Sequence, residues 1–313
     1  MPRVDLPTAA GLALGSLADQ AFGDPRRGHP VAGFGRAAAA LEPLTWRDSR
    51  TAGAGHWLAC VLPVAGLGVA ADRATRGRPV VRALVTGAAT WAVLGGTSLG
   101  RAGGRMSELL DDLPAARAHL PTLAGRDPSA LGEAELVRAT VESVAENTSD
   151  AAVAPLVWGA VAGVPGLLAY RAVNTLDAMV GYRSARYARF GWASARADDV
   201  ANWVPARLTA ALTVAVAPLV GGSASGAWRT WRRDGGAHPS PNSGRCEAAA
   251  AGALGVRLGG RNVYGTRVED RPTMGDGRAP VRADVGRAVA LSRAVWTAAA
   301  ALAVTARLLR RRP

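Results

Sequence analysis

The chain has 313 residues, of which 49% are hydrophobic, and a formal net charge of +13. All 37 basic residues are arginine, which excludes enzymes that need a Walker A lysine or a Schiff-base lysine, pyridoxal phosphate enzymes among them. The two cysteines, Cys60 and Cys246, lie far apart and outside any zinc-binding spacing, so neither a disulfide framework nor a zinc site is expected.

Long uncharged stretches recur along the chain and predict an all-α, polytopic integral membrane protein. The stretch 6–18 is short and ends at Asp19, so it predicts an interfacial or buried helix. Four others approach the length of about 20 residues that a membrane span needs. These are 51–71, 83–100, 151–170 and 208–228. A fifth, 294–306, is shorter, but Arg293 and Arg307 at its ends can snorkel to the interfaces.

We therefore expect about five transmembrane helices, within a single membrane-embedded catalytic domain over 1–313. Pro155 and Pro165 lie within 151–170 and predict a broken or re-entrant segment there, because proline removes a backbone donor and clashes with the preceding turn. The alternative is a soluble protein with buried helices. Four stretches of near-span length in one soluble domain would be unusual, however.

The arginines are spread through the loops, and no nucleic-acid-binding motif is present. Nucleic acid is therefore not an expected partner, whereas anionic lipid and an anionic substrate are. Arginine-rich segments at 73–82 and 307–312 favour a cytoplasmic side for those ends. Because 229–287 is also rich in arginine, no single orientation follows.

Three polar connecting segments, 101–150, 171–207 and 229–287, carry the motifs. In the first, Glu142, Glu146 and Asp150 follow one another at intervals of four residues and share one helix face. Like charges at this spacing repel, and Mg²⁺ is the natural counterion because it binds carboxylates and substrate phosphates together. The alternative is an acidic face offset by Arg138 or Arg171.

The second segment holds an Asn-x-x-Asp pair and an Asp-Asp-x-x-Asn set between hydrophobic stretches, where ionisable residues are usually functional. The residues are Asn174, Asp177, Asp198, Asp199 and Asn202. Interleaved arginines can bind phosphate or carboxylate oxygens, or can form structural ion pairs with these acids. If every uncharged stretch crosses the membrane, the segments 141–150 and 171–207 lie on opposite sides of the bilayer and cannot form one site. One site then requires either that a broken segment is re-entrant or that the clusters meet in a polar cavity within the membrane.

Two rigid loops complete the pattern. The segment 238–244 contains Ser240, Asn242 and two prolines, and it predicts either a binding loop or a surface turn. The segment 23–31 has the same character and carries His29.

Five segments in this order resemble the adenosylcobinamide-phosphate synthase family of cobalamin biosynthesis, also called CbiB or CobD. They are GDPRRGHPV at 23–31, VESVAENTSD at 141–150, YRAVNTLDAMVGYRSARYARFGW at 170–192, ARADDVANWVPARLTA at 195–210 and SPNSGRCEAAAAGALGVRLGG at 240–260. The resemblance runs from about residue 15 to 265. It departs from the family after Val31, where 32–35 replace a bulkier stretch.

The resemblance implies a multi-pass enzyme of the cell (inner) membrane, an ATP-dependent acid–amine ligase. Its reaction joins aminopropanol, or the phosphate ester of aminopropanol, through an amide bond to the free carboxylate of adenosylcobyric acid, a corrinoid. ATP and Mg²⁺ are the implied cofactors, and other late enzymes of the cobalamin pathway are possible further partners.

The family pattern, with the arginines around it, gives the expected site residues. Catalytic roles are expected for His29, Glu142, Glu146, Asp177, Asp198 and Asp199. Substrate or phosphate binding is expected for Asn147, Arg171, Asn174, Tyr182, Arg183, Asn202, Arg207, Ser240 and Asn242. The expected Mg²⁺ ligands are Glu146, Asp150, Asp177 and Asp198.

Amide synthesis from a carboxylate is simplest through an acyl phosphate formed from ATP. Without lysine, Arg171, Arg183 and Arg207 are the expected phosphate cations, and a carboxylate or His29 is the expected base for the amine. Two alternatives remain open. An Mg²⁺-dependent intramembrane prenyl-type transferase would also gather Asn and Asp around a diphosphate, and a transporter would use broken helices such as 151–170.

Overall fold

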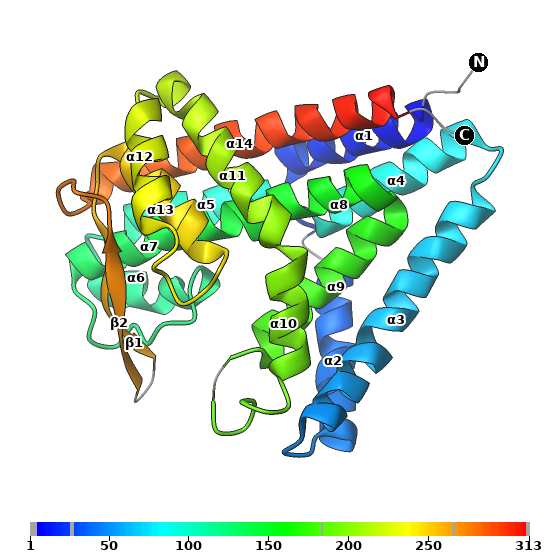
Figure 1. Ribbon diagram of the computed structural model, residues 1–313, viewed down its shortest axis with the longest axis horizontal. Coiled ribbons are helices and arrows are strands. Elements are labelled where there is room, and N and C mark those ends of the chain that lie inside the picture. The colour runs from blue at the N-terminus through cyan, green and yellow to red at the C-terminus, as the bar shows by residue number, and fades with distance from the viewer. Residues whose placement is uncertain (1–4, 26–27, 183, 265–266, 311–313) are drawn as a thin grey trace. The chain divides into compact units, whose positions relative to one another are not determined.

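The computed structural model describes residues 5–25, 28–182, 184–264 and 267–310. This part of the chain is almost entirely helical, with one two-stranded antiparallel hairpin (Figure 1). The chain forms two compact units, of which the first contains Met1–Gly95, Ala154–Asn202 and Ala299–Pro313, and the second contains Gly96–Val153 and Trp203–Ala298. The predicted all-α class is confirmed.

Four helical segments of the described chain are long and apolar enough to cross a membrane. They are Arg50–Ala74, Pro79–Leu109, Trp203–Val220 and Arg282–Leu309. The first two and the last contain the predicted stretches 51–71, 83–100 and 294–306. The stretch predicted at 208–228 is displaced, because its helix ends at Val220 and Gly221 turns the chain with a φ of 69°.

The stretch 151–170 is not among the candidate spans of the described chain, and the expected break within it is confirmed. A π-helical turn (Ser149–Val153) leads into α8 (Ala154–Ala162), Gly163 takes a φ of 68°, and α9 (Val164–Val180) starts anew. Pro165 lies in the first turn of α9, where its missing N–H costs no helical hydrogen bond. No candidate span then separates 141–150 from 171–207 along the described chain, so the parity conflict disappears.

The first unit consists of α1 (Leu6–Phe22), α2 (Pro30–Thr45), α3 (Arg50–Ala74), α4 (Pro79–Val93), α8, α9, α10 (Trp192–Ala201) and the end of α14. The short stretch 6–18 forms α1, which packs closely on α4 because two glycines one turn apart face two threonines. A Cβ on Gly11 would lie 2.4 Å from the Thr86 Cβ, and one on Gly15 equally close to the Thr90 Cβ.

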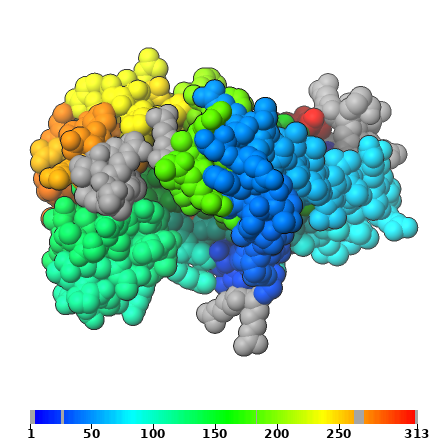
Figure 2. All heavy atoms as spheres, turned by 90° about the horizontal axis from the view of Figure 1, so that it is seen from below, coloured from blue at the N-terminus to red at the C-terminus, as the bar shows by residue number. Residues whose placement is uncertain are grey.

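Helix α3 has the surface expected of a lipid-facing span. Its side chains Leu58, Leu62 and Leu67 are 44%, 58% and 64% exposed, on a helix that lies at the surface of the first unit (Figure 2). Leucines exposed to this degree are unfavourable in water and favourable against acyl chains. Together with the candidate spans, this exposure identifies the chain as a membrane protein.

Another face of α3 packs against the segment 184–191 at Phe190. A Cβ on Gly53 would lie 1.8 Å from the carbonyl oxygen of Phe190, whose side chain is buried in the core of the first unit. Gly53→Ala is therefore expected to destabilise the protein by about 1–3 kcal/mol through overpacking. Gly55→Ala on the same helix meets nothing within 4 Å and should be neutral or slightly stabilising. Equal thermal midpoints of the two variants in detergent would contradict this packing.

The second unit begins with α5 (Gly96–Leu109), α6 (Leu113–His119), a 3-10 turn (Leu120–Thr122) and α7 (Glu133–Thr148). It continues with α11 (Trp203–Val216), a second 3-10 turn (Ala217–Val220), α12 (Ala224–Asp234) and α13 (Ser243–Leu254). The hairpin of β1 (Leu258–Tyr264) and β2 (Arg267–Met274) precedes α14 (Arg282–Leu309). Because α13 and β1 both pack on α7, the start of α13 and the start of β1 meet the polar residues of α7.

Candidate active site

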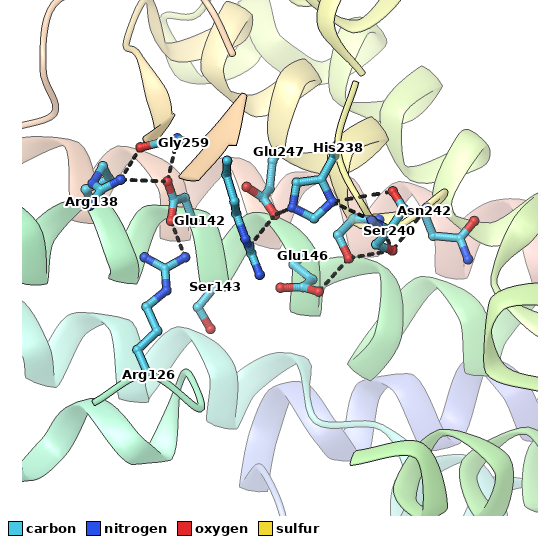
Figure 3. Close-up of polar contacts among 12 residues, drawn as sticks. Arg126, Arg138, Glu142, Ser143, Glu146, His238, Ser240, Asn242, Glu247 and Gly259 are labelled. Atoms are coloured by element: carbon cyan, nitrogen blue, oxygen red, sulfur yellow. Dashed lines mark hydrogen bonds and ion pairs between the residues drawn. The ribbon is translucent and has the colours of Figure 1, made fainter. Parts of the chain in front are cut away.

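The polar centre of the second unit is built on α7, and Glu142 forms one end of it (Figure 3). Its carboxylate accepts hydrogen bonds from Arg126 and from the Gly259 N–H (2.7 Å), and Arg138 Nη1 lies 4.0 Å away. Arg138 also donates to the carbonyl oxygens of Gly259 and Arg261, so it fastens β1 to α7. With 1% exposure and these partners, Glu142 fits the ion-pair alternative better than the expected catalytic role.

Glu146, one turn further along α7, has a different environment. It is half-buried, and its Oε1 accepts a hydrogen bond of 2.6 Å from the Ser243 hydroxyl at the start of α13. No arginine pairs with it among the described contacts, in contrast to Glu142. Asp150 follows in the π-helical turn, a distortion that is frequent at functional sites. Asn147 donates instead to the backbone oxygen of Ser143 (2.9 Å).

Hydrogen bonds among its own residues hold the loop 238–243 in one conformation, as expected of a binding loop. Ser240 Oγ accepts from the backbone N–H groups of Asn242 (3.3 Å) and Ser243 (3.2 Å), and it lies 3.1 Å from the Ser243 hydroxyl. His238 Nδ1 accepts from the Ser240 N–H (3.0 Å). His238 and Asn242 are buried, so the surface-turn alternative does not describe this loop. Its hydroxyl groups face Glu146 (Figure 3).

Glu247 is the principal site residue that the sequence did not reveal. It is 0% exposed, with Oε1 3.8 Å from His238 Nε2 and 4.0 Å from Arg271 Nη1. Neither carboxylate oxygen accepts a hydrogen bond from the described residues. Burial, followed by the nearby Glu142 and Glu146, raises the pKa of Glu247 well above its ordinary value. Its spacing of four residues from Ser243 was the available signal, since that spacing places both on one face of α13.

Cys246 is buried beside the acidic residues of α7. Burial raises the pKa of its thiol well above the ordinary value, and Asp150 and Glu146 raise it further. The thiol is therefore protonated and a poor nucleophile. The carboxylates of Glu146 and Asp150 therefore both act on the same thiol.

The first unit contains a separate network centred on Asp198. Its two carboxylate oxygens accept hydrogen bonds from the side-chain amides of Asn174 (3.2 Å) and Asn202 (3.0 Å). The Tyr170 hydroxyl donates to the Asn202 Oδ1 (2.9 Å). Arg171 Nη1 lies 3.4 Å from the Asn174 Oδ1. Three members of the predicted Asn/Asp cluster, Asn174, Asp198 and Asn202, are therefore in contact.

The other predicted residues on α9, on α10 and between these helices have contacts of their own. Asp177 lies against Gly181, where a Cβ would come 1.7 Å from the Asp177 Oδ1. Asp199 forms an ion pair of 3.6 Å with Arg196, as in the ion-bridge alternative. Tyr182 is 56% exposed and packs edge-on against Tyr187. Arg183 lies outside the described residues.

His29 and Arg207 are held by local contacts. His29 caps the start of α2 by accepting from the Val31 N–H at Nδ1 (3.2 Å), and its Nε2 lies 3.7 Å from Asp24. Neutral His29 therefore carries its proton on Nε2 and is poorly placed to act as a base. Arg207, in the second unit, stacks 4.0 Å over the Trp203 ring and donates to the Trp203 carbonyl (2.8 Å).

The four predicted Mg²⁺ ligands divide between the units, with Glu146 and Asp150 in the second and Asp177 and Asp198 in the first. Within the described residues, no group of three or more His, Cys, Asp or Glu side chains is arranged to hold a metal ion. A carboxylate pair nevertheless fits Mg²⁺, which commonly binds through one or two carboxylates together with substrate phosphates. The Mg²⁺ site stays a prediction.

Comparison with known proteins settles the family. The CobD/Cbib protein family matches residues 12–292. The chain belongs to this CobD/Cbib family. The match reaches beyond the segment of about 15 to 265 that carried the resemblance, and includes the start of α14 as far as Ser292.

Curated relatives of the CobD/Cbib family cover nearly the whole chain. The Cobalamin biosynthesis protein CobD of Mycobacterium tuberculosis is 59% identical over 97% of each chain. The proteins of the same name from Geobacter metallireducens and Chromobacterium violaceum are 47% identical over 87% of each chain, and 42% identical over 94% of this chain and 95% of the relative. No solved structure matches the chain significantly.

Proposed function

We propose that this CobD/Cbib protein is the ATP-dependent ligase of the cell (inner) membrane that joins adenosylcobyric acid to aminopropanol or aminopropanol phosphate. The observation that carries the proposal is the 59% identity to a cobalamin biosynthesis protein over 97% of the chain. The buried polar centre around Glu146 supports it, because charged groups are retained in membrane proteins mainly where they serve function. The carboxylate of the corrinoid and a primary amine are the reacting groups.

The reaction needs the carboxylate oxygen converted into a leaving group. We propose that a corrinoid carboxylate oxygen attacks the γ-phosphorus of ATP, which releases ADP and leaves an acyl phosphate. The amine nitrogen then attacks the acyl carbon, the C–N bond forms, and phosphate leaves with the former carboxylate oxygen. Mg²⁺, when bound, would neutralise phosphate charge during these steps.

In this proposal the residues of the chain have separate tasks. Glu146, with Asp150, would hold the metal, and the Ser243 hydroxyl fixes the Glu146 carboxylate in one orientation. Arg207, which belongs to the same unit as Glu146, would bind phosphate oxygens. Because His29 is occupied as a helix cap, we propose a carboxylate as the base that receives the amine proton.

The proposal is tested with purified protein in nanodiscs, supplied with adenosylcobyric acid, Mg-ATP and either aminopropanol or its phosphate. The amide product, identified by mass spectrometry, is expected with one of the amines and only when ATP is present. Product formation without ATP, or no product with either amine, would refute it. Product formation without any isoprenoid diphosphate would also exclude the prenyl-transferase alternative, and covalent product would exclude a transporter.

A further inference from the structure

Helix α12 occupies a defined place beside a candidate membrane span. The span Trp203–Val220 ends at Val220, and α12 (Ala224–Asp234) begins after a turn of three residues. Its inner side packs backbone to backbone on α13, where a Cβ on Gly252 would lie 2.2 Å from the Gly226 carbonyl oxygen. The start of α12 therefore lies at the level where the span leaves the hydrocarbon, next to the lipid headgroups.

The outer face of α12 has the side chains of an interfacial helix. Trp228 is 50% exposed, and Arg229 and Arg232 on the same face are also exposed. The Arg232 guanidinium lies 5.5 Å over the Trp228 ring, and Trp231 packs edge-on against Trp228 at the same centroid distance. Tryptophan with arginine is typical of helices at the boundary between headgroups and acyl chains.

A hollow of about 350 Å³ opens beside this face, between α12 and the end of α13. Its walls are largely glycine backbone, from Gly226, Gly252, Gly255 and Gly277. Its polar part is lined by Arg229, Thr230, Arg233 and Asp276. The two arginines differ in their partners. Arg233 is neutralised by Asp234 (2.6 Å) and Asp276 (2.5 Å), whereas Arg229 forms no ion pair among the described residues.

We propose that Arg229 and Arg232, together with the hollow between α12 and α13, bind the phosphate headgroup of an anionic phospholipid. The unneutralised charge of Arg229 at a backbone-lined hollow complements a phosphodiester. Trp228 supplies the apolar contact that a lipid has and a soluble phosphate lacks. The nearness of α12 to the end of a candidate span selects a lipid over a soluble anion as the occupant.

The test measures lipid binding by the full-length protein in detergent, by native mass spectrometry with phosphatidylglycerol and phosphatidylcholine. For the Arg229→Gln/Arg232→Gln protein, the dissociation constant for phosphatidylglycerol is expected to rise roughly twenty-five-fold, since each basic residue near an anionic surface contributes about fivefold. Phosphatidylcholine binding should not change. The matched control is Arg257→Gln/Arg261→Gln, which removes the same charge from two exposed arginines of the same unit.

Equal losses of phosphatidylglycerol in the two double variants would overturn the proposal, because binding would then follow net charge alone. Displacement of phosphatidylglycerol by inorganic phosphate would also overturn it and would assign the hollow to a soluble anion. The Arg229→Lys/Arg232→Lys variant keeps both charges and should retain most of the affinity. Trp228→Ala should weaken phosphatidylglycerol binding and leave the response to salt unchanged.

Discussion

Replacing Glu146 with glutamine is expected to lower the rate of amide formation about a hundredfold, which corresponds to the loss of about 3 kcal/mol of transition-state stabilisation. Glutamine keeps the shape of the side chain, and its oxygen can still accept the hydrogen bond from Ser243. Folding should therefore be preserved while a charged metal ligand is lost. The measurement is specific activity per folded molecule, with abundance in the membrane measured in parallel.

The control for Glu146→Gln is Glu108→Gln, because Glu108 is an exposed partner of Arg105. It should leave both activity and abundance unchanged. Near-normal specific activity of Glu146→Gln would defeat a metal-binding role for this carboxylate. Asp198→Asn is a less selective probe, because Asp198 accepts from two side-chain amides, and one of those contacts would then place two N–H donors against each other.

Removal of Arg126 is expected to have the largest effect on stability. Arg126 and Glu142 form an ion pair whose side chains are 7% and 2% exposed. Arg126→Met should reduce the free energy of unfolding by about 3–5 kcal/mol, because it leaves a buried carboxylate without its principal partner. The effect should appear as lower abundance and a lower thermal midpoint in detergent.

Two comparisons give this prediction its specificity. Arg105→Met breaks an ion pair whose side chains are 57% and 66% exposed, and it should cost less than about 1 kcal/mol. The double variant Arg126→Met/Glu142→Leu removes both charges and should be more stable than Arg126→Met alone. If the double variant is the less stable of the two, Glu142 is not held in the way the structure shows.

Helices and their ends could be predicted where a long uncharged stretch is interrupted by proline or glycine. The break in 151–170 follows from Pro165 and from a glycine directly before α9, both visible in the sequence. The end of the third span at Val220 could not be predicted from charge, because the uncharged run continues through the turn into α12. The hairpin Leu258–Met274 was also missed, since the segment is polar and short.

For the site, the sequence indicated residues but not their partners. The stripe of Glu142 and Glu146 on α7 was visible, yet their environments differ because Glu142 is paired with Arg126 from the loop before α7 and with Gly259 from β1, 117 residues further along the chain. Such tertiary pairing has no local signature. The cluster of Asn174, Asp198 and Asn202 was predictable as a group because its members lie on α9 and at the end of α10, two helices that pack together.

The most direct test of the proposed reaction follows the oxygen atoms of the corrinoid carboxylate. Adenosylcobyric acid labelled with ¹⁸O in its free carboxylate is converted by the purified protein with Mg-ATP and the accepted amine, and the released phosphate is analysed by mass spectrometry. The acyl phosphate route predicts that ¹⁸O appears in inorganic phosphate in step with amide formation. Amide formation with unlabelled phosphate, or with the label in AMP, would contradict it.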